Sequence, residues 1–150
     1  MHLVDEQAFS IELMDEGTQT TLPRSRICLD GKPTDAIIAG AIFEACIKIE
    51  KLYLVFTTDD CPFEEGLNIC LLDENLLLLD AMVLSHIYTT ATFRLHELKA
   101  PDRVVFEFLG DKLWEVCVFQ TPRFRLPYID PIGVSRKPGF KSYLQIAKCL

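Results

Sequence analysis

The chain has 150 residues, of which 49% are hydrophobic and 25% charged, and its formal net charge is −7. This composition is typical of one globular domain and excludes a disordered chain. The negative charge also argues against nucleic-acid binding, because phosphate recognition requires a basic face. No segment approaches the about 20 apolar residues of a membrane helix, and no signal peptide is recognisable. We therefore expect a single β-rich domain over residues 1–150, located in the cytoplasm.

Most of the chain consists of short runs of β-branched and aromatic residues separated by polar turns, which is typical of antiparallel strands. Asp30-Gly31 and Gly110-Asp111 have the composition of tight turns. The close spacing indicates an antiparallel meander, folded into a sandwich or closed like a barrel. The expected strands cover residues 9–14, 24–29, 51–58, 66–72, 76–84, 87–95, 104–109 and 113–119.

Residues 35–51 admit two interpretations. Every second residue from 37 to 49 is apolar, and the other positions include small and charged residues, which favours a half-buried strand. Thr34-Asp35 is also a suitable cap for a helix over residues 35–51, which would make the fold α+β. Residues 73–82 leave a similar choice between a strand and a short helix. We expect strands in both segments, and hence a mainly β fold.

Charge is distributed unevenly along the sequence. Residues 52–93 contain seven acidic residues and no Lys or Arg, whereas residues 120–150 contain six basic residues and one acid. Four prolines lie between Pro122 and Pro138, so we expect residues 120–150 to form a Pro-rich basic tail that packs on the domain.

The acids of the central segment are concentrated at the ends of the expected strands. They repel one another, and a cationic partner would relieve that repulsion and be steered toward the surface. An aromatic residue among them has the chemistry of an interface anchor. The alternative is a set of ordinary solvated turns. The expected partner-binding residues are Asp59, Asp60, Phe63, Glu64, Glu65, Asp73 and Glu74.

Catalytic and metal-binding motifs are absent from the sequence. It contains no phosphate-binding loop, dinucleotide-binding motif, nucleophile elbow or C-x-x-C pair. Cys61 lies among four carboxylates, which disfavour a reactive thiolate. Cys28, Cys46, Cys70 and Cys117 lie in apolar runs and are expected to be reduced core thiols. We therefore expect no enzyme activity, no cofactor and no metal.

One segment favours a different function. Alternation along residues 88–96 places Thr90, Thr92, Arg94 and His96 on one face, and this row is polar for a core strand. Such a row inside a barrel would indicate a small-ligand-binding or enzymatic β-barrel. A third possibility is an oligomerising scaffold subunit.

Residues 53–72, followed by residues 104–119, resemble small β-rich immunity proteins of bacterial polymorphic-toxin and contact-dependent growth inhibition systems. The resemblance lies in the succession of strands and acidic loops. It implies a cytoplasmic, acidic protein without enzyme activity. It also implies a partner, the C-terminal domain of a cognate toxin and often a basic nuclease, which the protein neutralises by covering its surface.

Overall fold

The structure is a computed structural model that describes residues 1–150 except 19, 62–63, 87–90, 111 and 150. Within the described residues every regular element is a β-strand and every strand pair is antiparallel. The expected mainly β, antiparallel fold is therefore confirmed. The strands are β1 (His2–Leu3), β2 (Phe9–Asp15), β3 (Arg24–Leu29), β4 (Lys32–Ala39), β5 (Ile42–Ile49), β6 (Leu52–Thr58), β7 (Gly66–Leu72), β8 (Leu78–Ser85), β9 (Arg94–Lys99), β10 (Arg103–Glu107), β11 (Leu113–Phe124), β12 (Val134–Ser135) and β13 (Lys141–Lys148).

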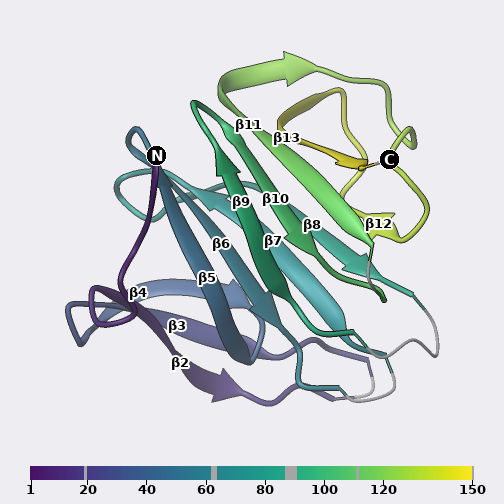
Figure 1. The fold of residues 1–150 in the computed structure, drawn as a ribbon. Coiled ribbons are helices and arrows are strands. Elements are labelled where there is room, and N and C mark those ends of the chain that lie inside the picture. The colour runs from purple at the N-terminus through teal and green to yellow at the C-terminus, as the bar shows by residue number, and fades with distance from the viewer. Residues whose placement is uncertain (19, 62–63, 87–90, 111, 150) are drawn as a thin grey trace.

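The strands form three sheets that stack as layers (Figure 1). The middle layer is a six-stranded sheet in the order β1-β5-β6-β7-β8-β12. The three-stranded sheet β2-β3-β4 covers one of its faces, and the four-stranded sheet β13-β11-β10-β9 covers the other. In each sheet the two edge strands do not pair with each other, so every sheet is open. Within the described residues the architecture is therefore a layered sandwich and not a closed barrel.

The middle sheet has a hydrophobic core on each face, which explains why its central strands are almost entirely apolar. In β6, Leu54 and Phe56 join the larger core against the four-stranded sheet, whereas Val55 joins the smaller core against β2–β4. All seven residues of β7 are buried. Burying one large apolar side chain contributes about 1.5–3 kcal/mol, so a strand buried on both faces gains from the apolar residues that point to either side. Trp114 of β11, fully buried, is the largest side chain of the larger core.

Residues 36–49 form the end of β4 and the whole of β5, so the expectation of strands is confirmed and the alternative helix over 35–51 is wrong. The expectation of one continuous strand is also wrong, because the chain turns at Gly40. This residue has φ +115°, and a Cβ there would collide with Thr57. The single-face interpretation fails as well: Cys46 faces the smaller core, and a bulge interrupts the register between Phe43 and Ala45.

Three other segments bear on predictions made from the sequence. The hairpin at Gly110 is confirmed, because β10 and β11 pair with Glu107 opposite Leu113. Residues 73–77 form a turn and β8 begins at Leu78, so the strand interpretation of residues 73–82 is confirmed for residues 78–82, and the short helix is wrong. Of the strand expected over 87–95, residues 87–90 lie outside the described residues, and β9 begins at Arg94.

Residues 120–150 are built into two of the sheets. β11 continues through Pro122 to Phe124, and β13 pairs alongside β11 as the edge strand of the four-stranded sheet. The loop between them contributes β12, which pairs with β8 at the edge of the middle sheet. This arrangement ties the long loop to two layers at once. Among the described residues, no helix has the length and hydropathy needed to cross a bilayer.

Candidate binding surfaces

The structure does not bring the six predicted acidic residues together. Asp59 to Glu65 lie in the connection between β6 and β7, whereas Asp73 and Glu74 lie in the turn between β7 and β8. These connections are at opposite ends of β7, which spans roughly 20 Å at 3.3–3.4 Å per residue. The acidic residues expected to bind the partner therefore form two separate groups and cannot act as one acidic patch. Phe63, the expected aromatic anchor, lies outside the described residues.

Five carboxylates do gather at one end of the middle sheet. The backbone N–H of Asp59 donates to Glu65 Oε1 at 2.7 Å, and Asn68 Nδ2 donates to Asp59 Oδ1 at 2.7 Å. A third side chain joins them from β5, where Glu44 accepts a 2.9 Å hydrogen bond from the Thr58 hydroxyl. We call this region the carboxylate end; it consists of Glu44, Asp59, Asp60, Glu64 and Glu65.

Burial and mutual repulsion make these charges unfavourable. Burial raises the pKa of Glu44, Asp59 and Glu65 above the ordinary value of a carboxyl group. The charge of Glu65 raises the pKa of Glu44 further, and the charge of Asp59 does the same for Glu65. None of the ion pairs found in the described residues involves the carboxylate end. A cation brought to this end would therefore meet unneutralised negative charge.

Sequence reasoning missed Glu44. In a regular strand this residue would occupy the polar face of β5, remote from any loop. The register shift between Phe43 and Ala45 makes Glu44 the extra residue of a bulge, and its side chain reaches Thr58 at the end of β6. Nothing in the local sequence signals that bulge, so only the pairing of β5 with β6 reveals the residue.

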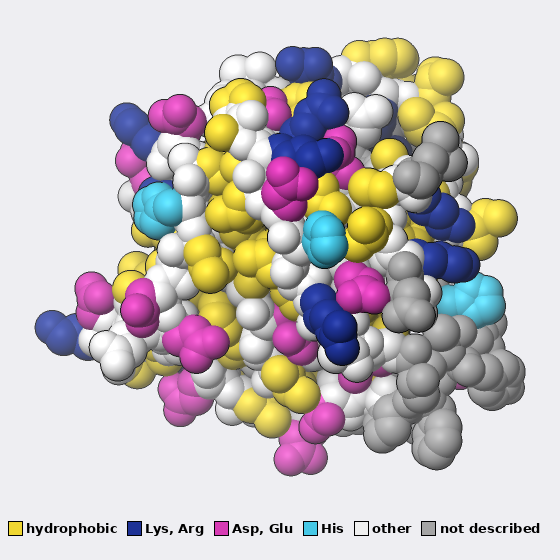
Figure 2. Space-filling view, in the orientation of Figure 1, with side chains coloured by type: hydrophobic (Ala, Val, Ile, Leu, Met, Phe, Trp, Pro, Cys, Tyr) yellow, Lys and Arg dark blue, Asp and Glu magenta, His cyan; other side chains and the backbone are white. Residues whose placement is uncertain are grey.

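A second surface is formed by the long loop between β11 and β13. Its large apolar side chains are exposed to between 56% and 85% of their full area, and they gather at the upper right of Figure 2. Monomeric proteins seldom leave so many large apolar residues of one loop in water without a binding role. The rings of Phe124 and Phe140 stack with centroids 6.3 Å apart. We call this set the apolar loop surface; it consists of Phe124, Leu126, Tyr128, Ile129, Ile132 and Phe140.

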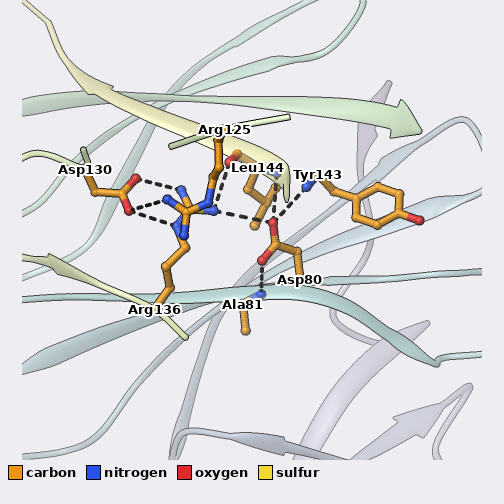
Figure 3. Close-up of polar contacts among 7 residues, drawn as sticks. All are labelled: Asp80, Ala81, Arg125, Asp130, Arg136, Tyr143 and Leu144. Carbon is orange, nitrogen blue, oxygen red and sulfur yellow. Dashed lines mark hydrogen bonds and ion pairs between the residues drawn. The ribbon is translucent and has the colours of Figure 1, made fainter. Parts of the chain in front are cut away.

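Buried charges hold the loop in place (Figure 3). Arg136, whose side chain is only 4% exposed, donates from Nη2 and Nε to the two oxygens of Asp130 at 2.9 and 3.1 Å. Its Nη1 donates to the Leu144 carbonyl at 3.0 Å and lies 3.5 Å from Asp80 Oδ2. Arg125 Nη1 also donates to Asp130 Oδ2, at 3.2 Å.

Asp80 connects this network to two sheets. Its Oδ2 accepts hydrogen bonds from the backbone N–H groups of Tyr143 and Leu144 at 2.9 and 3.0 Å, so a β8 side chain binds the backbone of β13. Charge-assisted hydrogen bonds of this kind are short and directional. The apolar loop surface therefore rests on a rigid base, even though its side chains are exposed. Sequence reasoning counted Asp80 among the free acids of the central segment and did not foresee its pairing with Arg136.

The polar residues that the sequence suggested as the lining of a cavity lie on the surface where they are described. Thr92, Arg94 and His96 are exposed, and Thr90 lies outside the described residues. Arg94 instead faces Glu107 of the neighbouring strand at 4.0 Å. The expectation that this row lines the interior of a barrel is therefore wrong for its described members.

The cysteines offer no reactive site. Cys28, Cys46 and Cys70 are buried as expected, whereas Cys117 is only half-buried. Burial raises the pKa of Cys70 to about 12 and that of Cys46 still further, so these thiols stay protonated at neutral pH. Cys61 is exposed beside the carboxylate end. Over the described part of the chain, no group of three or more His, Cys, Asp and Glu side chains has the geometry of a metal site.

Comparison of the chain with protein-family models, with curated proteins and with solved structures gives no match. Inferences about function therefore depend on the two surfaces and on the cavities beside them.

Proposed function

We propose that this protein acts by binding another protein, and that the apolar loop surface is the centre of the contact. The observation that carries the proposal is a set of six large apolar side chains, one at the end of β11 and five in the loop that follows, which are exposed while buried ion pairs fix the backbone of the loop. Exposed aromatic and aliphatic side chains on a rigid base have the character of interface hot spots. Because the loop is already ordered, little conformational entropy is lost when a partner binds.

The carboxylate end supports a cationic partner. The backbone N–H of Ser85, at the end of β8, donates to the Gly133 carbonyl, and Ser85 pairs with Gly66 at the start of β7. Ile132 thus lies about two strand spacings, or roughly 10 Å, from the strand that follows Glu65. A partner seated on Ile132 would also meet the carboxylates. Apolar contacts would supply affinity, and the carboxylates would supply steering and selectivity.

A toxin domain is the partner we propose on the basis of the resemblance of residues 53–72 and 104–119 to immunity proteins. In this proposal the protein is an immunity protein without catalytic activity of its own. It would act in the cytoplasm, where its cysteines remain reduced, and would neutralise a basic nuclease domain by covering its surface.

The test first asks whether a toxin gene lies immediately upstream of the gene for this chain. It then measures growth rescue in bacteria that express the C-terminal domain of that toxin, together with the dissociation constant of the two purified proteins. We expect the native chain to restore growth. The variants F124D and I132D should raise the dissociation constant at least about tenfold, because each buries a charge in an apolar contact.

L77D is the matched control. Leu77 is 63% exposed and lies in the turn at the opposite end of β7, so this variant should bind and rescue like the native chain. Equal rescue by F124D, I132D and L77D would remove the apolar loop surface from the interface. Absence of any complex with the native chain would refute the proposed function itself.

A second candidate function, binding of a small apolar ligand, is favoured by a groove of about 500 Å³ between β4 and β8. Its walls include Ile38, Cys70, Met82 and Val83, and its size is in the range of small-molecule sites. Decanol should shift the methyl NMR signals of Ile38 and Val83, and A81W, which fills the groove, should abolish the shifts. Unchanged methyl signals in the native chain would exclude this function.

A further inference from the structure

Arg125 has an unsatisfied guanidinium group beneath the apolar loop surface. Its side chain is 9% exposed, and its Nη1 donates to Asp130 Oδ2 at 3.2 Å. The Nε–H is buried and has no hydrogen-bond partner, and no hydrogen bond found among the described residues uses Nη2. Asp130 already accepts two hydrogen bonds from Arg136. A buried guanidinium with one edge unpaired is uncommon, because such donors usually find an acceptor.

Arg125 also lines a cavity of about 420 Å³ that opens beside this network. Phe124, Leu126 and Ile129 of the apolar loop surface form apolar walls of the same cavity. Arg123 lies at the cavity too, with its guanidinium 4.0 Å from the centre of the Phe119 ring. The cavity therefore combines apolar walls with positive charge.

The charges around the cavity favour an anion. Its lining includes three arginines, Arg123, Arg125 and Arg136, and one acidic residue, Asp130. Nε and Nη2 form the side edge of a guanidinium, and this edge matches the two oxygens of a carboxylate. The apolar walls favour an anion attached to an apolar group over a small hydrated ion.

We propose that this cavity receives the carboxylate of an Asp or Glu side chain of the partner protein, with an adjacent apolar residue of that partner against Phe124 and Ile129. The inference rests on the proposed function, which it deepens by naming the chemistry of one contact. The partner's carboxylate supplies an acceptor for the guanidinium of Arg125, and the buried Nε–H comes within reach of that carboxylate when the side chain turns toward the cavity. Arg123 adds a second positive charge at the cavity.

The experiment titrates 3-phenylpropanoate into the full-length protein and follows the arginine Nε–H signals by NMR. Its neutral analogue 3-phenylpropanamide and inorganic phosphate are titrated separately. We expect 3-phenylpropanoate to shift the Arg125 signal with saturation, and the other two compounds to leave it within the noise. Equal shifts with the amide, or a larger response to phosphate, would overturn the inference.

Variants separate the site from general surface binding. R125K keeps the charge but loses the forked geometry, and it should weaken 3-phenylpropanoate binding about tenfold, the loss expected for one hydrogen bond to a charged group. R123S removes an exposed positive charge at the cavity, and it should weaken binding by only about threefold, because solvent screens that charge. R103S, on the exposed face of the four-stranded sheet, should bind like the native chain. A loss in R103S equal to that in R123S would overturn the inference.

The same variants distinguish this inference from the proposed function when the toxin domain is the ligand. If F124D abolishes the complex but R125K and R123S bind normally, the carboxylate contact is refuted and the apolar contact stands. If all three variants bind normally, both are refuted.

Discussion

The carboxylate end and the apolar loop surface distribute charge in opposite ways. At the loop, Arg136 and its partners are buried, and the side chains in water are apolar. At the carboxylate end the charges lie in or near water and have no cationic partner among the described residues. The charges beneath the apolar loop surface thus hold the loop in position, whereas the charges of the carboxylate end remain available to a partner.

The largest effect should follow from removing the charge that positions the loop. R136M leaves Asp80 without its cation and Asp130 with Arg125 alone, and breaking a buried ion pair in this way costs about 3–5 kcal/mol. Urea unfolding should show this loss, and partner binding should weaken because the apolar loop surface loses its base.

R103M is the matched control, because Arg103 forms an exposed pair with Glu115 at 3.0 Å. It should leave the unfolding curve nearly unchanged, since solvent screens such pairs. Similar curves for R136M and R103M would show that the buried network does not hold the loop.

The next largest effect tests the rigidity of the other region. Gly40 links β4 to β5 beside the carboxylate end, its carbonyl accepts a 2.6 Å hydrogen bond from the Ser25 hydroxyl, and a Cβ there would collide with Thr57. G40A should therefore lower the free energy of unfolding by about 3 kcal/mol, from overpacking together with the positive φ.

G31A separates those two causes. Gly31 has φ +79° and nothing within 4 Å of an added Cβ, so its substitution bears only the conformational cost of about 1 kcal/mol. Denaturation of both variants under the same conditions provides the comparison. Equal losses would mean that contact with Thr57 is not what makes Gly40 necessary.

The strands of the middle sheet were predictable, because apolar runs such as residues 66–72 are long and bounded by turns. The break at Gly40 and the bulge at Glu44 were not, since both depend on how β5 meets Thr57 and Thr58 of the next strand. Local periodicity carries no information about such contacts. It predicts which residues are extended but not where a strand must bend to fit its neighbour.

The functional residues were harder to predict than the fold. The contact between Arg136 and Asp80 joins residues 56 positions apart, and it depends on the pairing of β12 with β8. The sequence also gives no sign that Phe124 and Phe140 are exposed, because aromatic residues usually indicate a core. Counting acids by segment correctly identified Asp59 to Glu65 as a carboxylate-rich loop. It failed for Asp73 and Glu74, because strand length places them at the other end of the sheet.

A smaller effect tests whether the carboxylate end steers the partner. D60K/E64K reverses two exposed charges of the β6–β7 connection. It should slow association with the toxin domain about tenfold and flatten the dependence of the rate on salt. Stopped-flow measurements at several salt concentrations would show this change, and the dissociation rate should change little.

The control is D73K/E74K, which makes the same charge change at the opposite end of β7. If the partner docks at the carboxylate end, this variant should retain more of the native rate and a steeper salt dependence. Identical behaviour of the two double variants would mean that only net charge matters, and would remove Asp60 and Glu64 from the contact.

The smallest effect concerns the loss of folding stability caused by partly buried carboxylates that repel one another and have no cation nearby. Burial raises the pKa of Glu44 and Glu65 in the folded state above 4.5, the value for an unperturbed Glu. As the pH falls through the raised folded pKa toward 4.5, the folded state takes up protons before the unfolded state does. Acidification therefore increases the free energy of unfolding, because it removes the unfavourable charges of Glu44 and Glu65 from the folded state. The full destabilising effect of these two charges is present only at pH values above their folded pKa.

E44Q/E65Q removes both charges and keeps the oxygen atoms that accept hydrogen bonds from the Thr58 hydroxyl and the Asp59 backbone. The variant should be more stable than the native chain at pH 7, by less than about 1 kcal/mol because both groups are partly exposed to solvent. Urea unfolding between pH 7 and pH 4.5 should show this advantage shrinking as the pH falls, because protonation relieves the native chain. An advantage of E44Q/E65Q that stays constant with pH would mean that the two substitutions act by packing, and that the carboxylate end holds no electrostatic strain for a partner to relieve.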